Sequence, residues 1–418
     1  MTKILLAVII AASALLPEAA ATRYVGGDIS LLPEYETAGA VYLDHDGNSI
    51  GDVLPWFGSQ GMNAMRVRLF VNPYQYAGSD KDPNACQDME YILPLCRRIK
   101  AAGYALMLDF HYSDTWADPA KQWTPAQWAD LTDSQLCERI YNYTRETLQT
   151  LADAGATPDF IQTGNEISFG MLWGPVGTPE AQQKRTYMGS DANWARLGQL
   201  LSGAIRACRE VCPSARVILH TERVVDTAVM NNFYSRMRDM SVGYDIIGLS
   251  YYPYWHGGLT VLRNALDQLT RNFPGREIMI VETGYSYKWA VPGTTYDLTG
   301  TYPYSDAGQA KFADDLVALL AGYDNVTGLF WWWPEYNAYG TSLSGWYNAP
   351  LFDSTTGRAT SALSRFCRFG DDGGGVGAVY GDADDAAWYD LMGVKVSDGD
   401  RPSHSGIYIH RRRPVLVK

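Results

Sequence analysis

The chain has 418 residues, of which 46% are hydrophobic and 19% charged, which excludes a disordered polymer and allows a sizeable core. Its net charge of −12 makes it a poor candidate for binding a phosphate backbone, so we expect no nucleic-acid partner. The length suits one large α/β barrel with an appendage.

Residues 1–21 have the pattern of an export signal. Lys3 is the positive residue, "ILLAVIIAASALL" is the apolar stretch, and Ala19 to Ala21 provide a small-residue cleavage site. The apolar stretch is too short for a comfortable transmembrane helix, and no second one follows. We therefore expect an exported protein (periplasmic, on the cell surface or secreted) that begins near Thr22, has no transmembrane segment and is a monomer.

Eight short apolar segments rich in β-forming residues predict strands. They cover residues 24–30, 63–71, 104–112, 159–167, 216–222, 244–252, 277–285 and 326–333. Amphipathic helical patterns lie between most of them, as in 86–103, 132–155 and 193–213, and the first of these stops at Gly103. Strands that alternate with helices predict a parallel sheet, and eight such units predict an α/β protein of the (β/α)₈ barrel type.

The barrel is expected to fill residues 22–370. The glycine-rich stretch "GDDGGGVGAVYGDADD" then breaks the pattern, so residues 371–385 are predicted to be a linker. Residues 386–418 predict two or three short strands around a turn. This tail resembles the sorting tails of certain exported bacterial proteins, and a small β appendage without a sorting role is the alternative.

The six cysteines do not have the spacing of a disulfide framework. Cys208 and Cys212 are four residues apart on a predicted helix, where Cβ atoms lie about 5–6 Å apart, whereas a disulfide needs about 3.8 Å. Cys86, Cys96 and Cys137 lie on other stretches with a helical pattern. At most one or two disulfides are expected, and no Cys–His spacing suggests a zinc site.

Two glutamates lie at the C-terminal ends of predicted strands, where this fold places its active site. Glu166 follows the fourth strand and Glu282 ends the seventh, so both should project into one cleft. One carboxylic acid of such a pair can protonate a glycosidic oxygen while the other, ionised, attacks the anomeric carbon. A calcium site and two structural acids are the alternatives, and the joint placement favours catalysis.

Other strand ends carry side chains suited to a sugar-binding site. They are Asp28, Arg68, Asp109, His111, His220, Glu222, Tyr251, Tyr252, Trp332 and Trp333. Arg68 could pair with a carboxylate and keep it ionised. Asn165 could bond the 2-OH of the sugar, and Trp332 could offer a flat apolar face to a pyranose ring.

Six stretches together resemble the endo-β-1,4-galactanases of glycoside hydrolase family 53. They are "GGDIS", "MNAMRVRLFVNP", "LMLDFHYSDTWADPAKQ", "QTGNEISFGMLW", "DIIGLSYYPYWHG" and "VETGY". The resemblance implies a barrel that cleaves internal β-1,4-galactosidic bonds of a pectic galactan, type I arabinogalactan, with retention. Its partners would be this polysaccharide and galacto-oligosaccharides.

The same resemblance implies roles for individual residues. Glu166 would be the acid/base, Asn165 its partner at the 2-OH, and Glu282 the nucleophile. Arg68, His111, His220, Tyr252 and Trp332 would line the central subsite. Asp114 and Trp116 would bind the sugar on the non-reducing side, and we expect Asp109 to contribute to substrate binding.

The chain departs from the family at the eighth strand, where Trp332-Trp333-Pro334 replaces the usual Trp-Glu-Pro. Some members bind calcium between the last two strand-end loops, but "SYKWAVPGTTYDLTGTYPYSD" and "PEYNAYGTSLSGWYNAP" show no ligand series, so we expect no metal and no cofactor. Another retaining endo-glycanase (a mannanase or cellulase) is the alternative, and a non-catalytic glycan-binding barrel is another.

Overall fold

The structure is a computed structural model that describes residues 22–186, 191–343 and 349–371 and parts of the tail from 387 to 417. The expected export signal, residues 1–21, and most of the expected linker lie outside the described residues.

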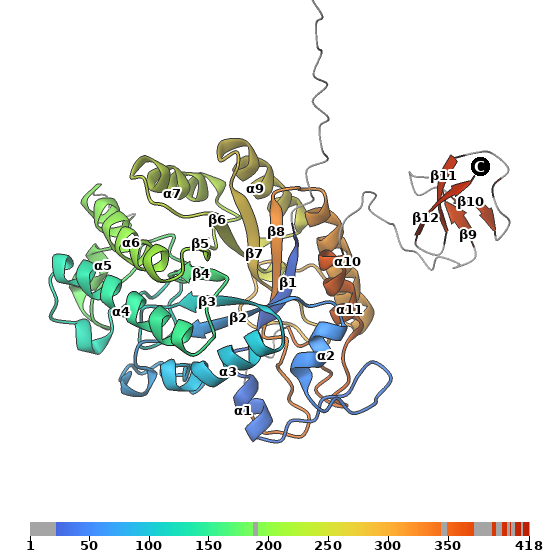
Figure 1. The fold of residues 1–418 in the computed structure, drawn as a ribbon, viewed down its shortest axis with the longest axis horizontal. Coiled ribbons are helices and arrows are strands. Elements are labelled where there is room, and N and C mark those ends of the chain that lie inside the picture. Colours follow the sequence, from blue (N-terminus) through green and yellow to red (C-terminus); the bar gives the residue numbers. More distant parts are fainter. Residues whose placement is uncertain are drawn as a thin grey trace, which may run out of the picture.

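Eight parallel strands close into a barrel in the order of the chain (Figure 1). They are β1 Tyr24–Asp28, β2 Ala64–Leu69, β3 Ala105–Phe110, β4 Phe160–Thr163, β5 Arg216–Thr221, β6 Ile246–Tyr251, β7 Glu277–Thr283 and β8 Val326–Trp332. Each strand falls within one of the eight predicted segments. The predicted (β/α)₈ barrel is therefore confirmed.

The helices surround the barrel (Figure 1). They are α1 Leu32–Thr37, α2 Val53–Ser59, α3 Met89–Ala101, α4 Asp133–Asp153, α5 Pro179–Gln183, α6 Asp191–Val211, α7 Thr227–Asp239, α8 Pro253–His256, α9 Leu259–Asn272, α10 Asp306–Ala321 and α11 Ser361–Cys367. Short 3₁₀ turns occupy Pro73–Gln75, Ala126–Trp128 and Arg368–Gly370.

Helix α3 shows how the sequence sets a local boundary. The Asp88 side chain accepts a hydrogen bond from the backbone N of Tyr91 at 2.9 Å, which caps the N-terminus. Gly103 follows the C-terminus with φ +87°, a backbone conformation that suits glycine. The apolar face of α3 (Ile92, Leu95, Cys96 and Ile99) is buried, and burial of each large side chain stabilises the fold by about 1.5–3 kcal/mol.

The interior of the barrel changes from apolar to polar along the strands. Apolar side chains that point inward form one cluster, which consists of Ala64, Met107, Phe160, Ile218, Ile246, Met279, Val281 and Phe330. Gly26 keeps β1 close to its neighbour, because a Cβ atom there would lie 1.7 Å from the carbonyl oxygen of Ala64. Nearer the C-terminal ends the inward side chains include Asp28, Arg66 and Asp109, all fully buried. These charges must be paired there, because an unpaired buried charge is costly.

The tail forms an antiparallel sheet of four strands in the order β10-β9-β11-β12. Its strands are β9 Ala387–Tyr389, β10 Lys395–Asp398, β11 Gly406–His410 and β12 Arg413–Val417. The appendage is therefore present, but the prediction of two or three strands was too low. Hydrogen bonding between β11 and β12 runs from Gly406 opposite Val417 to His410 opposite Arg413, a pairing that composition alone does not reveal.

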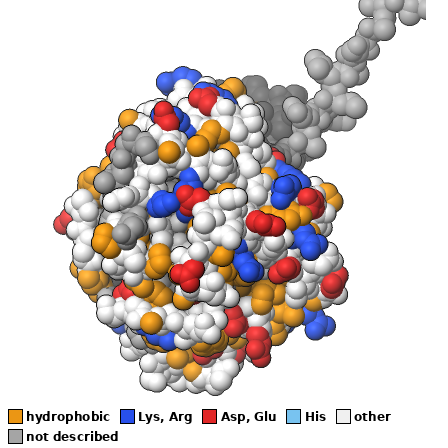
Figure 2. Space-filling view, turned by 90° about the vertical axis from the view of Figure 1, so that its left-hand side faces the viewer, with side chains coloured by type: hydrophobic (Ala, Val, Ile, Leu, Met, Phe, Trp, Pro, Cys, Tyr) orange, Lys and Arg blue, Asp and Glu red, His pale blue; other side chains and the backbone are white. Residues whose placement is uncertain are grey.

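Three further features bear on the sequence predictions. All six cysteines are unpaired, and Cys86 precedes α3 rather than lying within it. Within the described ranges, no helix is both long and apolar enough to cross a membrane. Figure 2 shows one face of the molecule, on which basic and acidic side chains are interspersed rather than gathered by sign.

Candidate active site

A cleft of about 790 Å³ opens at the C-terminal ends of the strands. Its lining includes Asn165, Glu166, Tyr252 and Glu282. One wall follows β2, β3 and β8 and consists of Asp82, Asn84, Trp116, Ala117, Asp118, Pro119, Lys121, Trp332 and Trp333. The other wall follows β5, β6 and β7 and consists of Glu222, Arg223, Val225, Asp226, Trp255, His256, Thr295 and Tyr296.

Glu166 reaches the cleft through an unusual backbone. Gly164 has φ +102° and Glu166 itself has φ +48°, a left-handed conformation that costs a non-glycine residue about 1–3 kcal/mol. The hydroxyl of Ser250 donates to Glu166 Oε1 at 2.7 Å. Burial, together with the nearby carboxyls of Glu282 and Glu222, raises the pKa of Glu166 well above its usual value. This carboxyl is suited to holding a proton.

Glu282 has a different electrostatic environment. Its Oε1 lies 3.0 Å from Arg66 Nη2, and its Oε2 accepts a hydrogen bond of 3.0 Å from the Tyr252 hydroxyl. Burial raises the pKa of Glu282 to about 7, while Arg66 and the Tyr252 hydroxyl favour the ionised form. Glu282 therefore faces a cation, whereas the charged groups acting on Glu166 are carboxyls, so Glu282 is the carboxyl that ionises first.

Arg66, which the sequence analysis did not single out, joins the charged groups beneath the cleft. Its Nη1 lies 3.2 Å from Asp28 Oδ2, and its Nη2 lies 2.7 Å from Asp109 Oδ2. The same Nη2 donates to Asn165 Oδ1 at 2.9 Å. One signal could have indicated Arg66: it lies two residues before Arg68, so both side chains point to the same face of β2.

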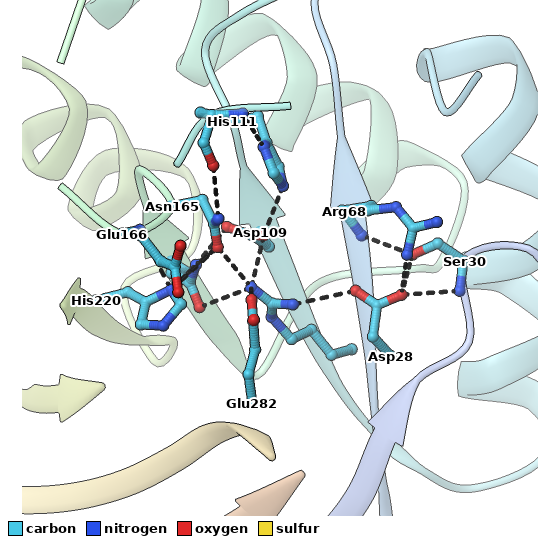
Figure 3. A network of polar contacts seen from close by, with 12 residues as sticks. Asp28, Ser30, Arg68, Asp109, His111, Asn165, Glu166, His220 and Glu282 are labelled. Atoms are coloured by element: carbon cyan, nitrogen blue, oxygen red, sulfur yellow. Dashed lines mark hydrogen bonds and ion pairs between the residues drawn. The ribbon is translucent and has the colours of Figure 1, made fainter. Parts of the chain in front are cut away.

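Arg68 supports the aromatic wall of the cleft. Its carboxylate partner is Asp28, at 2.7 Å from Arg68 Nη1. Its guanidinium carbon lies 4.8, 5.3 and 4.6 Å from the ring centres of Trp116, Trp332 and Trp333. These are cation–π distances, and Arg68 is fully buried behind the rings. Figure 3 shows Arg68 and Asp28 apart from the group around Asn165, Glu166 and His220.

His220 contacts both Asn165 and Ser250, the side chains next to Glu166. Its Nε2 lies 2.8 Å from the Ser250 hydroxyl, and its Nδ1 lies 3.0 Å from Asn165 Oδ1. Burial and the charge of Arg66 lower the pKa of His220 well below its usual value, so the ring is neutral. Asn165 Nδ2 donates to the carbonyl oxygen of Ala117 at 2.8 Å. This network orients Asn165 and Ser250 around Glu166.

His111 and Asp114 hold the loop after β3. His111 Nδ1 accepts from the backbone N of Ala117 at 3.0 Å, and its Nε2 lies 3.2 Å from Asp109 Oδ2. Asp114 accepts hydrogen bonds of 2.9 and 2.8 Å from the backbone N atoms of Asn72 and Ala126. Trp116 lies between these anchored residues and lines the cleft.

The structure thus divides the predicted site residues into two groups. Trp116, Asn165, Glu166, Tyr252, Glu282 and Trp332 line the cleft. Arg68, Asp109, His111, Asp114 and His220 are buried next to it and contact the lining residues or their loops. Sequence reasoning missed Arg66 and Ser250, as well as Arg223 and Tyr296 in the second wall.

The tryptophan that departs from the family pattern also lies in the cleft wall. Trp333 has φ +58° and stacks on Trp332 with ring centres 5.6 Å apart and planes at 19°. Two residues further on, Glu335 is buried and its Oε1 accepts from the backbone N of Leu31 at 3.0 Å. In the described part of the chain, no group of three or more His, Cys, Asp or Glu side chains is arranged to hold a metal ion.

Comparison with known proteins identifies the family to which the chain belongs. The model of glycosyl hydrolase family 53 matches residues 24–366. An arabinogalactan endo-β-1,4-galactanase of Thermothelomyces thermophilus is 30% identical over 361 residues, which cover 83% of this chain and 100% of that protein. A probable arabinogalactan endo-β-1,4-galactanase A of Aspergillus terreus is 33% identical over 364 residues, which cover 84% and 97%.

The solved structures agree. The GH53 catalytic domain of Ignisphaera aggregans matches with a TM-score of 0.70 and 32% identity, over 86% of this chain and 99% of that one. A fungal β-1,4-galactanase structure matches with a TM-score of 0.70 and 29% identity, over 83% and 100%. The predicted resemblance is therefore confirmed, and the chain belongs to glycosyl hydrolase family 53.

Proposed function

We propose that this protein is a retaining endo-β-1,4-galactanase that hydrolyses internal bonds of pectic galactan, type I arabinogalactan. The observation that carries the proposal is the pair Glu166 and Glu282, which share one cleft but have opposite electrostatic partners. Membership of family 53 and the galactanase names of the relatives support the choice of galactan.

In the first step, Glu282 attacks the anomeric carbon of a galactosyl unit. A bond forms between that carbon and a Glu282 oxygen, while the bond to the glycosidic oxygen breaks. Glu166 gives its proton to the departing oxygen, so the leaving chain ends in a neutral hydroxyl. Arg66 and the Tyr252 hydroxyl favour ionised Glu282 before the attack.

In the second step, the now ionised Glu166 accepts a proton from water as the water oxygen attacks the same carbon. The bond to Glu282 breaks and the carboxylate returns to its pair with Arg66. Two inversions give net retention, so the product is the β anomer. Asn165 bonds the 2-OH and Trp332 offers a ring face to the sugar, roles that are supported by the position of both residues in the cleft lining.

The substrate is tested by comparing reducing-sugar release from linear β-1,4-galactan, mannan and cellulose. Rapid release from galactan alone, with intermediate oligosaccharides before the final products, is the expected result. A preference for mannan or cellulose would assign a different endo-glycanase activity. Proton NMR of the first product should show the β anomer, and an initial α anomer would refute the covalent mechanism.

We also propose that the enzyme acts as an exported monomer without a metal ion. The pattern of residues 1–21 supports export, and N-terminal sequencing of the mature protein should then begin near Thr22. Dialysis against EDTA should leave the rate on galactan unchanged. A loss of activity that calcium restores would contradict the metal-free proposal.

A further inference from the structure

The positions of Glu166 and Glu282 divide the mouth of the barrel into two halves. Glu166 follows β4 and Glu282 lies at the end of β7. The eight strands follow one another around the closed barrel in sequence order. One half contains the ends of β8, β1, β2 and β3, and the other contains the ends of β5 and β6. The cleft crosses both halves, so a polysaccharide in it would extend to both sides of the two carboxyls.

The position of Asn165 indicates which half of the cleft binds which part of the galactan. This assignment rests on the proposed function. The side chain of Asn165 is tied to the carbonyl oxygen of Ala117, in the loop after β3. A galactosyl unit whose 2-OH contacts Asn165 therefore lies on the β8–β3 side, with Trp116 and Trp332. The leaving chain, which receives the proton of Glu166, must then extend over the ends of β5 and β6.

A fixed ion pair lines this second half. Arg223 Nε lies 2.6 Å from Glu222 Oε1, and the Ser168 hydroxyl donates to Glu222 Oε2 at 2.8 Å. The guanidinium carbon of Arg223 lies 4.3 Å from the ring centre of Phe169. Arg223 is thus held in place through Nε and its planar face, and a guanidinium has further N–H donors. Both residues of the pair line the cleft.

An aromatic surface lies next to the ion pair. The backbone N atoms of Thr295 and Tyr296 donate to the carbonyl oxygen of Tyr254 at 2.9 and 3.0 Å. Trp255 Nε1 donates to the carbonyl oxygen of Gly293 at 3.2 Å, which fastens the same loop. Tyr296 nevertheless keeps 38% of its surface exposed, and both it and Trp255 line the cleft. An exposed aromatic ring on an anchored loop inside a cleft is suited to contact a ligand.

We propose that Arg223, Trp255 and Tyr296 form binding subsites for the galactosyl units of the leaving chain. Arg223 donates hydrogen bonds to sugar hydroxyls, and the two rings pack against the C–H faces of the pyranoses. Because these contacts lie beyond the bond that breaks, they act on galactan but not on a substrate with a very small leaving group. They also hold an acceptor sugar when the glycosyl-enzyme transfers to sugar instead of water.

The test compares Tyr296→Ala and Arg223→Ala with the wild-type enzyme on two substrates. On linear galactan, kcat/KM should fall about three- to tenfold for each variant, the scale of one lost ring or hydrogen-bond contact. On β-galactobiosyl fluoride, whose leaving group is a single atom, kcat/KM should not change. Transfer to added galactobiose should fall in parallel with the galactan rate.

Three controls accompany the test. Tyr339→Ala removes a tyrosine that is also 38% exposed but does not line the cleft, and it should behave as wild type on both substrates. Tyr296→Phe keeps the ring and should restore most of the galactan rate. Thermal unfolding shows that each variant is folded.

Unchanged galactan kinetics in both alanine variants, or an equal loss on the fluoride, would overturn the inference. If the wild-type enzyme cleaved the fluoride but not galactan, the proposed function itself would fail, and that result is distinguishable from the other two.

Discussion

Glu166 combines features that each cost free energy: a left-handed backbone, burial, and carboxyls as its charged neighbours. Glu282 lies within β7, three strands later, and has Arg66 beside it. The difference between acid and nucleophile is therefore a matter of neighbouring side chains rather than of residue type. Two predictions follow from these neighbours.

Removing either carboxyl should have a distinct chemical signature. Glu282→Ala should lower activity on every substrate by several orders of magnitude, because no covalent intermediate can form. Glu166→Ala should be severe on galactan but much milder in the first step on aryl glycosides, whose leaving group needs no proton. Added azide should restore turnover with a β product in Glu166→Ala and an α product in Glu282→Ala. The opposite pair of configurations would reverse the two assignments.

Ser250 should set the pH at which Glu166 loses its proton. Its hydroxyl donates to Glu166 Oε1 at 2.7 Å, a bond that stabilises the ionised form and lowers the pKa of this carboxyl. Ser250→Ala should therefore raise the pKa of Glu166 and move the basic limb of the pH–rate profile upward by about one unit. Ser30→Ala is the control, because it also removes a serine hydroxyl that donates to a carboxylate, but that carboxylate is Asp28 rather than Glu166. A downward shift in Ser250→Ala would contradict the assignment.

At the scale of elements, the end of β8 and the segment that follows it carry both the aromatic wall and a buried acid. Trp332 and Trp333 lie against Arg68, while Glu335 turns inward and bonds the backbone of Leu31. Burial and the charge of Asp28 raise the pKa of Glu335 to about 8. Glu335 is therefore protonated in the folded protein at neutral pH, whereas an unfolded glutamate is ionised there.

This difference predicts how stability depends on pH. A carboxyl whose pKa is raised on folding contributes its full stability below its unfolded pKa of about 4.3 and loses it as pH rises through the folded value of about 8. Glu335→Gln keeps an oxygen for the Leu31 backbone and does not ionise. The melting temperature of the variant should thus fall less than that of wild type between pH 5 and pH 9. Parallel curves would show that Glu335 is not protonated in the folded state.

At the scale of the whole molecule, the described barrel contains every residue that lines the cleft, and the family model ends at residue 366. The tail forms a β sheet of its own strands, and its sorting role remains a prediction. A chain of residues 22–371 should therefore retain kcat/KM on galactan and its melting temperature. A large loss of either would show that the tail contributes to the barrel or to substrate binding.

The sequence by itself determined the alternation of eight strands and helices, because strand and helix periodicities are local properties of the chain. It also placed Glu166 and Glu282 at strand ends, and the rule that parallel strands end at one face of a barrel brought them together. Gly103 predicted where α3 stops for the same local reason, whereas the helix begins at Met89 rather than at the predicted Cys86. The motifs around these residues were sufficient to identify the family.

Only the tertiary structure decided which residues face the sugar and which lie behind it. Arg66 and Arg68 share one strand face, and both pair with Asp28. Arg66 also reaches Glu282, whereas Arg68 lies against Trp116 and Trp333. This choice depends on the height of each residue in the barrel and on the side chains that other strands bring there. The wall formed by Arg223 and Tyr296 comes from loops, whose paths are set by long-range anchors such as the Tyr254 carbonyl rather than by any periodic pattern.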